Sequence, residues 1–305
     1  MNGVLVIDKA AGLTSHDVVS RVRRLLGQRS VGHLGTLDPL ATGVLPLVLG
    51  SLTRLAQFYT SSEKTYEGVI RFGFATDTYD TEGEPTGAAQ EVKPSLQLLG
   101  KLAAGFVGVI EQLPPPFSAK KIHGVPAYKL ARQHKQVGLK PVQVEIKELE
   151  ILGVEGARAR FRARVGSGTY MRSVAHEMGQ QLGCGGHLES LRRTAVAEFG
   201  MGDAHSLEEV EAAIEKFPVS ELFFHPRKLL PHLPSVTATE DAAAFIRTGR
   251  AVNLPDMSRA RQVKVFSGQK DLIAIATRVA GTLFRPKIVL AGEPGALDGG
   301  GGGHS

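Results

Sequence analysis

A short segment at 31–46, rich in glycine and apolar residues, constrains this chain more than any other. Its glycines at positions 32, 35 and 43 permit tight turns and the close approach of another backbone. One carboxylate, Asp38, stands among leucines, and Pro39 biases it toward an extended conformation. A carboxylate in such surroundings is either well paired or functional. From the residues alone both interpretations stay open, and the structural one is favoured.

A second segment, 166–172, is a Gly-rich turn that enters a helix. Backbone amides at such a helix start can bind a phosphate. Tyr170 and Arg172 fall in the first turn, and Arg172 could pair with Asp38 and keep it ionised. The alternative is an exposed arginine. Neither segment has the Walker-type pattern, which argues against binding of a nucleoside triphosphate.

The 305 residues suffice for one large domain and a smaller one. The net charge is +6, and the acid-free stretch 112–144 carries all of it. Its cations are Lys120, Lys121, Lys129, Arg132, Lys135 and Lys140. Most charge runs are solvated loops or helices, but so long a gap without an acid favours a surface that faces phosphates.

Hydrophobic periodicity predicts an α+β fold. Alternation indicates strands at 64–74, 142–152 and 157–165, and caps and spacing indicate helices at 14–26, 95–104, 169–182 and 239–248. The segment 188–197 looks like a loop that enters a strand. These strands predict a mixed, mainly antiparallel sheet with flanking helices and a central cleft.

Two charged patterns need an interpretation. Four acids at 77, 80, 82 and 84 lack the spacing of a calcium loop and are expected to form a solvated turn. Four arginines at 158, 160, 162 and 164 share one strand face, which either touches RNA or is a wet sheet face. The residues do not decide between these two.

Cys184 is the only cysteine, so no intrachain disulfide can form, and it is expected to be a small buried side chain. Cys184 and His187 alone do not make a zinc site. The start of the chain lacks the pattern of a signal peptide, and no apolar run approaches a membrane span. We therefore expect a cytoplasmic protein with no membrane partner.

The segment 32–46 resembles the catalytic motif of the bacterial tRNA pseudouridine-55 synthases, the TruB family of pseudouridine synthases. Further blocks resemble the same family in the same order, from about residue 3 to 200. They are Asp8-Lys9 with Thr14-Ser15, Lys64 with Tyr66, Thr76-Asp77-Thr78 with Asp80, Leu113-Pro114-Pro115 onward to Arg132, Gly168-Thr169-Tyr170 with Arg172, and Leu191-Arg192-Arg193. Ala10 and Phe117 depart from the usual Pro and Tyr.

The resemblance implies a function: isomerisation of uridine 55 in the tRNA T-loop by base flipping and carboxylate-assisted cleavage of the glycosidic bond. Asp38 matches the catalytic aspartate, by attack on the ribose or as a base in a glycal route. The residues that match substrate-binding or neighbouring positions are Lys9, His33, Tyr66, Tyr170, Arg172 and Leu191. No cofactor or metal is implied, the partner is the T-arm of tRNA, and the enzyme is expected to act as a monomer.

The resemblance also implies a domain organisation. A catalytic domain spans 1–230, with an RNA-gripping basic insertion at about 112–144. A composition break at 231–234 precedes a small β-rich PUA-like RNA-binding domain at 235–291, and a Gly-rich tail, 292–305, is expected to be disordered.

Two rival functions stay open. The first is a non-catalytic RNA-binding protein, or tRNA-folding chaperone, on the same scaffold. The second is a carboxylate-dependent glycosidase, which would need a second catalytic Asp or Glu opposite the first. None of the matching blocks places one there.

Overall fold

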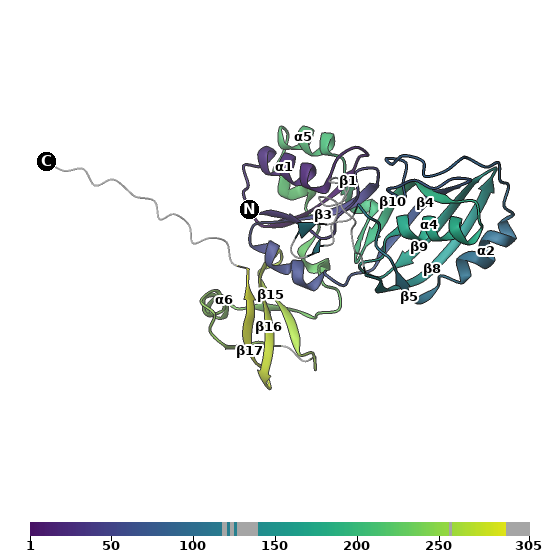
Figure 1. The fold of residues 1–305 in the computed structure, drawn as a ribbon. Helices are drawn as coiled ribbons and strands as arrows, with labels where there is room; N and C mark the ends of the chain where they lie inside the picture. The colour runs from purple at the N-terminus through teal and green to yellow at the C-terminus, as the bar shows by residue number, and fades with distance from the viewer. Residues whose placement is uncertain (118–120, 123–124, 127–139, 256–257, 291–305) are drawn as a thin grey trace.

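The computed structural model describes residues 1–117, 121–122, 125–126, 140–255 and 258–290. It confirms the α+β class, because a mixed and mainly antiparallel sheet runs through the catalytic part with helices packed against it (Figure 1). Most of the basic stretch 112–144 and the tail 292–305 lie outside the described residues.

Ten strands of the described chain form the main sheet. In spatial order its path is β12 (Ala204–His205), β1 (Gly3–Lys9), β3 (Thr42–Leu49), β10 (Gly186–Val196), β4 (Lys64–Phe72), β9 (Arg158–Val165), β8 (Val142–Glu155) and β5 (Gly108–Gln112). Off this path, β2 (Val31–His33) pairs with β3, and β11 (Phe199–Gly200) pairs with β10. The β1–β12 and β3–β10 pairs are parallel, and the others are antiparallel. A separate small hairpin pairs β6 (Lys121–Ile122) with β7 (Val125–Pro126).

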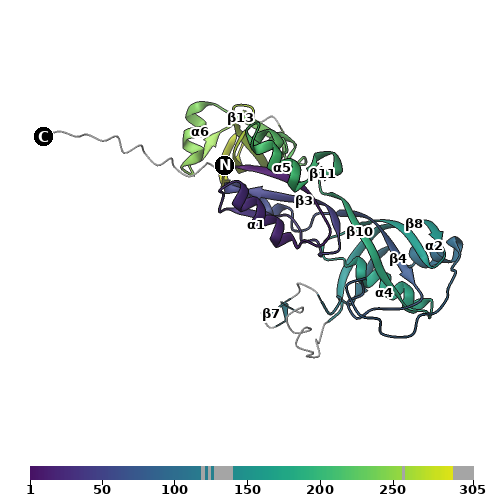
Figure 2. The ribbon, with the colours of Figure 1, turned by 90° about the horizontal axis from the view of Figure 1, so that it is seen from above.

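Helices cover the two ends of this sheet (Figures 1 and 2). The helices of the catalytic part are α1 (Ser15–Leu25), α2 (Leu96–Ala104), α4 (Met171–Gln181), α5 (Leu207–Ile214) and the 3₁₀ helices η1 (Gly50–Phe58), η2 (Met201–Asp203), η3 (Val219–Leu222) and η4 (Pro226–Lys228). Helices α1 and α5 pack together at the β1 end, while α4 lies on β10 and α2 on β8. None of the helices in the described residues has the length and apolar content that crossing a bilayer requires.

Local chemistry explains where these elements begin and end. The Thr14 side chain caps α1 by accepting a hydrogen bond from the Asp17 amide. The Asp17 carboxylate in turn accepts one from the Thr14 amide, so both backbone donors are satisfied. Strand β4 ends at Phe72 because Gly73 adopts a φ of +105°. The interpretation of 188–197 as a loop entering a strand is wrong, since β10 is continuous strand from Gly186 with two irregularities in its pairing with β4.

The exposed arginines of β9 lie on a wet sheet face. Arg158 pairs with Glu189, Arg162 with Glu67, and Arg164 with Glu63 and Glu148. Three of the four guanidiniums therefore already face carboxylates from β4, β8, β10 or the residue before β4, which favours a network of ion pairs across the sheet over an RNA contact.

A second, five-stranded sheet follows residue 234. Its order is β13 (Ser235–Ala238), β15 (Gln262–Ser267), β16 (Asp271–Ala280), β17 (Leu283–Val289) and β14 (Val252–Asn253), with helix α6 (Glu240–Arg247) against it. One apolar cluster continues from the catalytic part into this unit, since Phe266 and Ile275 join Val6 and Phe199 in it. The buried Lys264 ammonium also binds the Leu229 carbonyl, at 2.5 Å. The unit is therefore docked through a shared core.

Candidate active site

A cavity of about 290 Å³ lies where the loop 35–38, β4, β10 and the start of α4 meet. Its wall includes Asp38 and side chains from segments far apart in the sequence. The lining residues that matter for chemistry are Asp38, Lys64, Tyr66, Tyr170, Arg172, Leu191 and Arg193. The sheet therefore brings five of the seven sequence-predicted site residues to one cavity: Asp38, Tyr66, Tyr170, Arg172 and Leu191.

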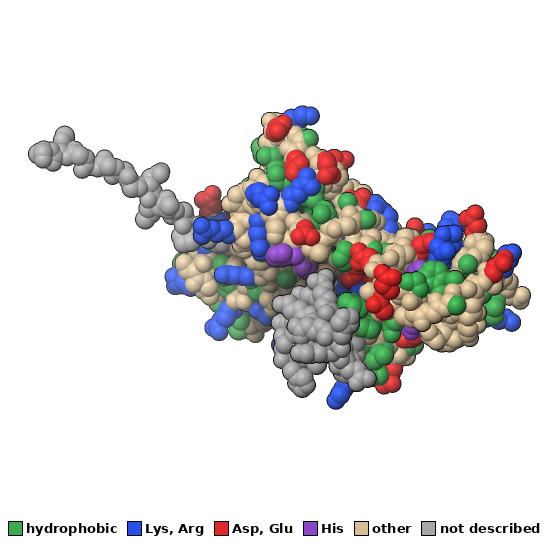
Figure 3. Space-filling view, turned by 45° about the horizontal axis from the view of Figure 1, so that its top comes forward, with side chains coloured by type: hydrophobic (Ala, Val, Ile, Leu, Met, Phe, Trp, Pro, Cys, Tyr) green, Lys and Arg blue, Asp and Glu red, His purple; other side chains and the backbone are tan. Residues whose placement is uncertain are grey.

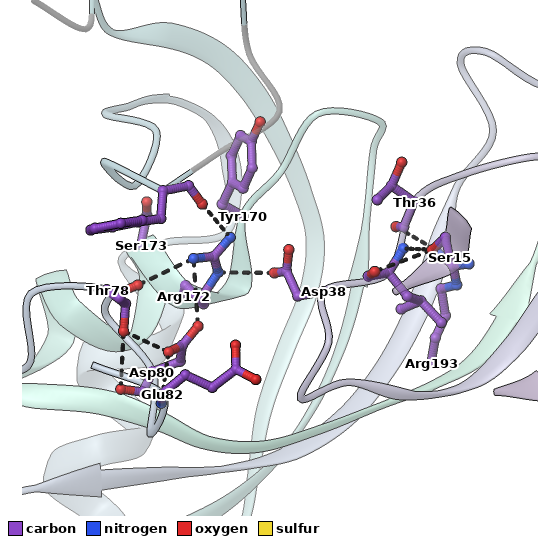
Figure 4. A network of polar contacts seen from close by, with 12 residues as sticks. Ser15, Thr36, Asp38, Thr78, Asp80, Glu82, Tyr170, Arg172, Ser173 and Arg193 are labelled. Carbon is purple, nitrogen blue, oxygen red and sulfur yellow. Dashed lines mark hydrogen bonds and ion pairs between the residues drawn. The ribbon is translucent and has the colours of Figure 1, made fainter. Parts of the chain in front are cut away.

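Asp38 is ion-paired with Arg172, as the sequence suggested (Figure 4). Arg172 Nε lies 2.9 Å from Asp38 Oδ2, but the N–H does not point at that oxygen, so the contact is an ion pair and not a hydrogen bond. The Arg172 side chain is 5% exposed, whereas that of Asp38 is 35% exposed. The carboxylate is thus fixed by a buried cation and remains open to the cavity.

Arg172 is held in turn by groups that the sequence did not predict. Its Nη1 donates to the Thr78 carbonyl at 3.2 Å and lies 3.5 Å from Asp80 Oδ2, and its Nη2 donates to the Phe117 carbonyl at 3.0 Å. The expectation of a solvated acidic turn is wrong for Asp80, which is buried and accepts hydrogen bonds from Thr78 Oγ1 and the Glu82 amide. Burial raises the pKa of Asp80, and these hydrogen bonds and Arg172 partly offset the rise.

The backbone around Asp38 is anchored from the N-terminal strand and helix. The buried Lys9 ammonium donates to the carbonyls of Ala10, Leu13 and Pro39 at 2.9, 2.6 and 3.2 Å. Ser15 Oγ accepts from the Leu37 amide at 2.8 Å and donates to the Leu37 carbonyl at 3.2 Å. Lys9 thus lies behind the loop and not in the cavity, so it acts on the site by fixing the residues on both sides of Asp38.

Arg193 anchors the same loop from β10. This fully buried guanidinium donates to the carbonyls of Val44, Thr36 and Gly35 at 2.8, 3.1 and 3.0 Å. Burial lowers the pKa of Arg193 from its ordinary value, which the neighbouring Tyr66 hydroxyl and Asp38 partly offset. Sequence reasoning missed this role, although Arg193 stands in one of the blocks that carry the resemblance.

Aromatic and apolar side chains form the rest of the wall. Tyr66 on β4 and Leu191 on β10 are each 8% exposed, and both line the cavity. Tyr170 precedes α4, and the buried Gln112 side chain fixes its backbone, accepting from its amide at 2.8 Å and donating to its carbonyl at 3.2 Å. Gln112 was also missed, since its partner lies 58 residues away.

His33 lies elsewhere, in a second cavity of about 730 Å³. The two cavities share Thr36, Leu37, Asp38 and Arg172, so Asp38 stands in the wall between them. Burial lowers the pKa of His33, and the Arg193 cation lowers it further. Glu82 also lines this cavity, and burial together with Asp80 and Asp38 raises its pKa.

This arrangement can place one carboxylate against a small planar ring held between apolar and aromatic walls. In the described part of the chain, no three His, Cys, Asp or Glu side chains converge as metal ligands would. Cys184 is buried, as expected from the sequence.

Comparison with known proteins identifies the family. Residues 23–171 match the family model described as "TruB family pseudouridylate synthase (N terminal domain)", and residues 172–222 match "tRNA pseudouridylate synthase B C-terminal domain". A tRNA pseudouridine synthase B from Solibacter usitatus (strain Ellin6076) is 48% identical over 95% of this chain and 100% of its own length. The chain belongs to the TruB family.

Other TruB relatives and solved structures agree with this assignment. A tRNA pseudouridine synthase B from Geotalea uraniireducens (strain Rf4) is 38% identical and covers 97% of this chain and 93% of its own length. The chain of a solved "Cbf5-Nop10-Gar1 Complex" has a TM-score of 0.68 at 24% identity, and covers 95% of this chain and 85% of its own. That of an "H/ACA RNP bound to a substrate RNA containing 2'-deoxyuridine" has a TM-score of 0.69 at 23% identity, with the same coverage. These two likenesses support the fold.

Proposed function

We propose that this protein is a tRNA pseudouridine synthase that isomerises uridine 55 of the tRNA T-loop, with Asp38 as its catalytic carboxylate. The observation that carries the proposal is the Asp38–Arg172 ion pair in the wall of a cavity lined by Tyr66 and Leu191. Membership of the TruB family makes the protein an isomerase that forms pseudouridine in tRNA. The choice of position 55 rests on that family assignment.

The proposed reaction includes base flipping. A uridine stacked inside a folded loop cannot reach Asp38, so it must leave the stack at a cost of a few kcal/mol. Stacking of a base on an aromatic side chain returns about 1–3 kcal/mol. Tyr66 is placed to supply this contact on one face of the uracil, with Leu191 and Tyr170 as further walls.

The reaction is an isomerisation, so atoms balance without a cofactor. The C1′–N1 bond breaks and its electrons leave with the uracil, the ring turns, a C1′–C5 bond forms, the C5 proton is released, and N1 takes up a proton. Asp38 either attacks the ribose carbon and is displaced when C5 bonds to it, or removes a ribose proton in a glycal route and returns it. In both routes Arg172 positions the carboxylate, and the Lys9, Ser15 and Arg193 anchors keep its loop from moving.

The proposed domain organisation is a catalytic domain at 1–230, a PUA-like domain at 235–291 and a tail at 292–305. The PUA-like domain is proposed to bind RNA. Residues 258–290 hold seven Lys and Arg and a single acid, Asp271. Blue cationic side chains accordingly mark this unit at the left of Figure 3. A groove of about 570 Å³ on it is lined by His232, Leu233, Ala260, Arg261, Gln262, Thr277 and Lys287, with no carboxylate. Such a groove suits a phosphate backbone.

The remaining partner assignments are part of the same proposal. The basic stretch 112–144 is proposed to grip the T-arm, and its charged residues lie mostly outside the described residues. Action as a monomer and residence in the cytoplasm stay predictions.

The direct test is tritium release from tRNA transcripts labelled at C5 of uridine. The wild-type protein should release label from one uridine per tRNA, and a transcript with cytidine in place of uridine 55 should release none above background. Tight binding without any release would favour the rival RNA-binding or chaperone role. Release that persists with cytidine 55 would support pseudouridine formation but refute position 55 as the modified site.

A further inference from the structure

Among the described residues, Lys64 lines the cavity but neither contacts Asp38 through an ion pair nor anchors its loop by a hydrogen bond. It opens strand β4, two residues before Tyr66, so both side chains point to the same face of the strand and both line the cavity with Asp38. A Cβ built on Gly35 would lie 3.7 Å from Lys64 Cε and 3.5 Å from Arg193 Nη1. Lys64 therefore packs against the loop that carries Asp38.

Lys64 differs from the two arginines of the cavity in how its donors are used. Arg193 donates to three backbone carbonyls on and beside the Asp38 loop, whereas Arg172 donates to the Thr78 and Phe117 carbonyls and ion-pairs with Asp38. Lys64 Nζ donates to the Ser62 carbonyl at 2.6 Å, and within the described residues this is its one hydrogen bond. An ammonium has three donors, so two remain for a guest in the cavity.

The reaction proposed above creates a charge that needs such a group. When the C1′–N1 bond breaks, its electron pair leaves with the uracil, whose anion spreads charge over N1 and the ring carbonyl oxygens. A cation fixed in a site with little water stabilises developing charge far better than it would in bulk solvent. Asp38 is itself an anion and cannot supply this.

We propose that the Lys64 ammonium binds a carbonyl oxygen of the detached uracil and stabilises its negative charge while the ring turns. The proposal rests on the pseudouridine synthase function. No proton needs to move: the ammonium stays charged, and the hydrogen bond follows the oxygen until the C1′–C5 bond forms and the C5 proton leaves.

The surroundings of Lys64 make its protonation sensitive to an anion in the cavity. Burial lowers the pKa of Lys64 to about 8, with a smaller contribution from the Arg193 cation. The charged and titratable groups around it in the cavity are Asp38, Tyr66, Tyr170, Arg172 and Arg193. An anion arriving in the cavity opposes both effects, so the guest and the charged form of Lys64 stabilise each other.

Single-turnover kinetics with enzyme in excess test the proposal. Lys64→Met should lower the rate at saturating enzyme by about 10- to 100-fold, the range for one charged hydrogen bond, and leave the Kd for tRNA within about twofold. Lys64→Arg should recover most of the rate. Lys101→Met, an exposed lysine on α2 away from both cavities, is the matched control and should behave as wild type.

The other roles that Lys64 could have predict different results. A phosphate anchor would raise Kd and lower the salt slope of binding by about one, with an unchanged saturating rate. A structural prop would lower the urea midpoint of Lys64→Met and lower the rate of Lys64→Arg as well. Either result overturns the proposal, while tritium release by the wild type keeps the proposed function intact.

The pH profile gives a second readout. The apparent second-order rate constant reports groups of the free enzyme. For the wild type it should fall above about pH 8 as Lys64 loses its proton. Burial also lowers the pKa of Lys9 to about 8, so the comparison of variants decides the assignment. The decline should weaken in Lys64→Arg, whose side chain stays charged; an identical decline in that variant would assign it to another group and count against Lys64.

Discussion

Replacement of Arg193 by methionine is the perturbation that tests how the Asp38 loop is held. The guanidinium is fully buried and donates three hydrogen bonds, to the carbonyls of Val44, Thr36 and Gly35. Methionine fills much of the same space and removes all three.

The expected loss in the free energy of unfolding depends on which of the three carbonyls water can reach in the variant. Thr36 is exposed and Gly35 is partly exposed at the cavity, so solvent can replace their lost partner. Val44 is fully buried, and an unsatisfied buried carbonyl costs about 1–3 kcal/mol. Removing a buried cation returns part of its desolvation penalty. We therefore expect the free energy of unfolding of Arg193→Met to fall by about 1–3 kcal/mol, with the urea m-value unchanged.

The rate of the chemical step should also fall, through an effect separate from the loss of stability. Residues 35–38 lose their anchor on β10, and a displacement of the reacting group by about 1 Å can cost about 100-fold in rate. Urea unfolding and single-turnover tritium release measure the two effects separately. Arg192→Met is the matched control, because Arg192 is partly exposed and pairs with Asp8 at 2.6 Å, outside the cavity. It should cost less than about 1 kcal/mol and leave the rate unchanged.

Two outcomes would refute this reasoning. If Arg193→Met unfolds and reacts as the wild type does, its hydrogen bonds do not hold the loop. If it loses stability but keeps the full rate, Arg193 supports the fold and has no part in positioning Asp38.

Three further predictions concern other parts of the site and the fold. Asp80→Asn keeps the shape but removes the charge that faces Arg172, so the saturating rate should fall about tenfold or more without a change in tRNA affinity; an unchanged rate would contradict the role of Asp80. Tyr59→Phe removes a 2.5 Å hydrogen bond to Glu198, and urea unfolding should show a loss of about 1–3 kcal/mol at an unchanged rate. Burial lowers the pKa of Lys9 from 10.5 to about 8, so between these values the unfolded chain holds a proton that the folded one has released, and stability rises with pH. Lys9→Met should reduce that rise in urea titrations; an unaltered rise would refute the assignment.

The sequence predicted those features that local pattern determines. The capped start of the first helix near residue 14 and the alternation in β4 are visible within a few residues, although the strand expected at 64–74 overran the observed end at Phe72. The pairing of Asp38 with Arg172 was also anticipated, because both residues stand in blocks that resemble one family.

The features that were missed depend on contacts between distant segments. Asp80 looked like one of four acids in a solvated turn, and only the fold shows that it is buried beside Arg172. Arg193 and Gln112 reach partners on other strands and loops, so no local spacing reveals them. Strand β3 was not predicted, since Gly43 and Pro46 are unusual in strands and hide the pattern.

The most direct test of the central claim is tritium release by Asp38→Asn under single-turnover conditions, with tRNA binding measured in parallel. The substitution keeps the size of the side chain and removes its charge. The account predicts wild-type folding, a Kd for tRNA within about twofold of wild type, and no release above background, because the lost group acts only in the chemical step. Release at a rate near that of the wild type would show that Asp38 is not the catalytic carboxylate.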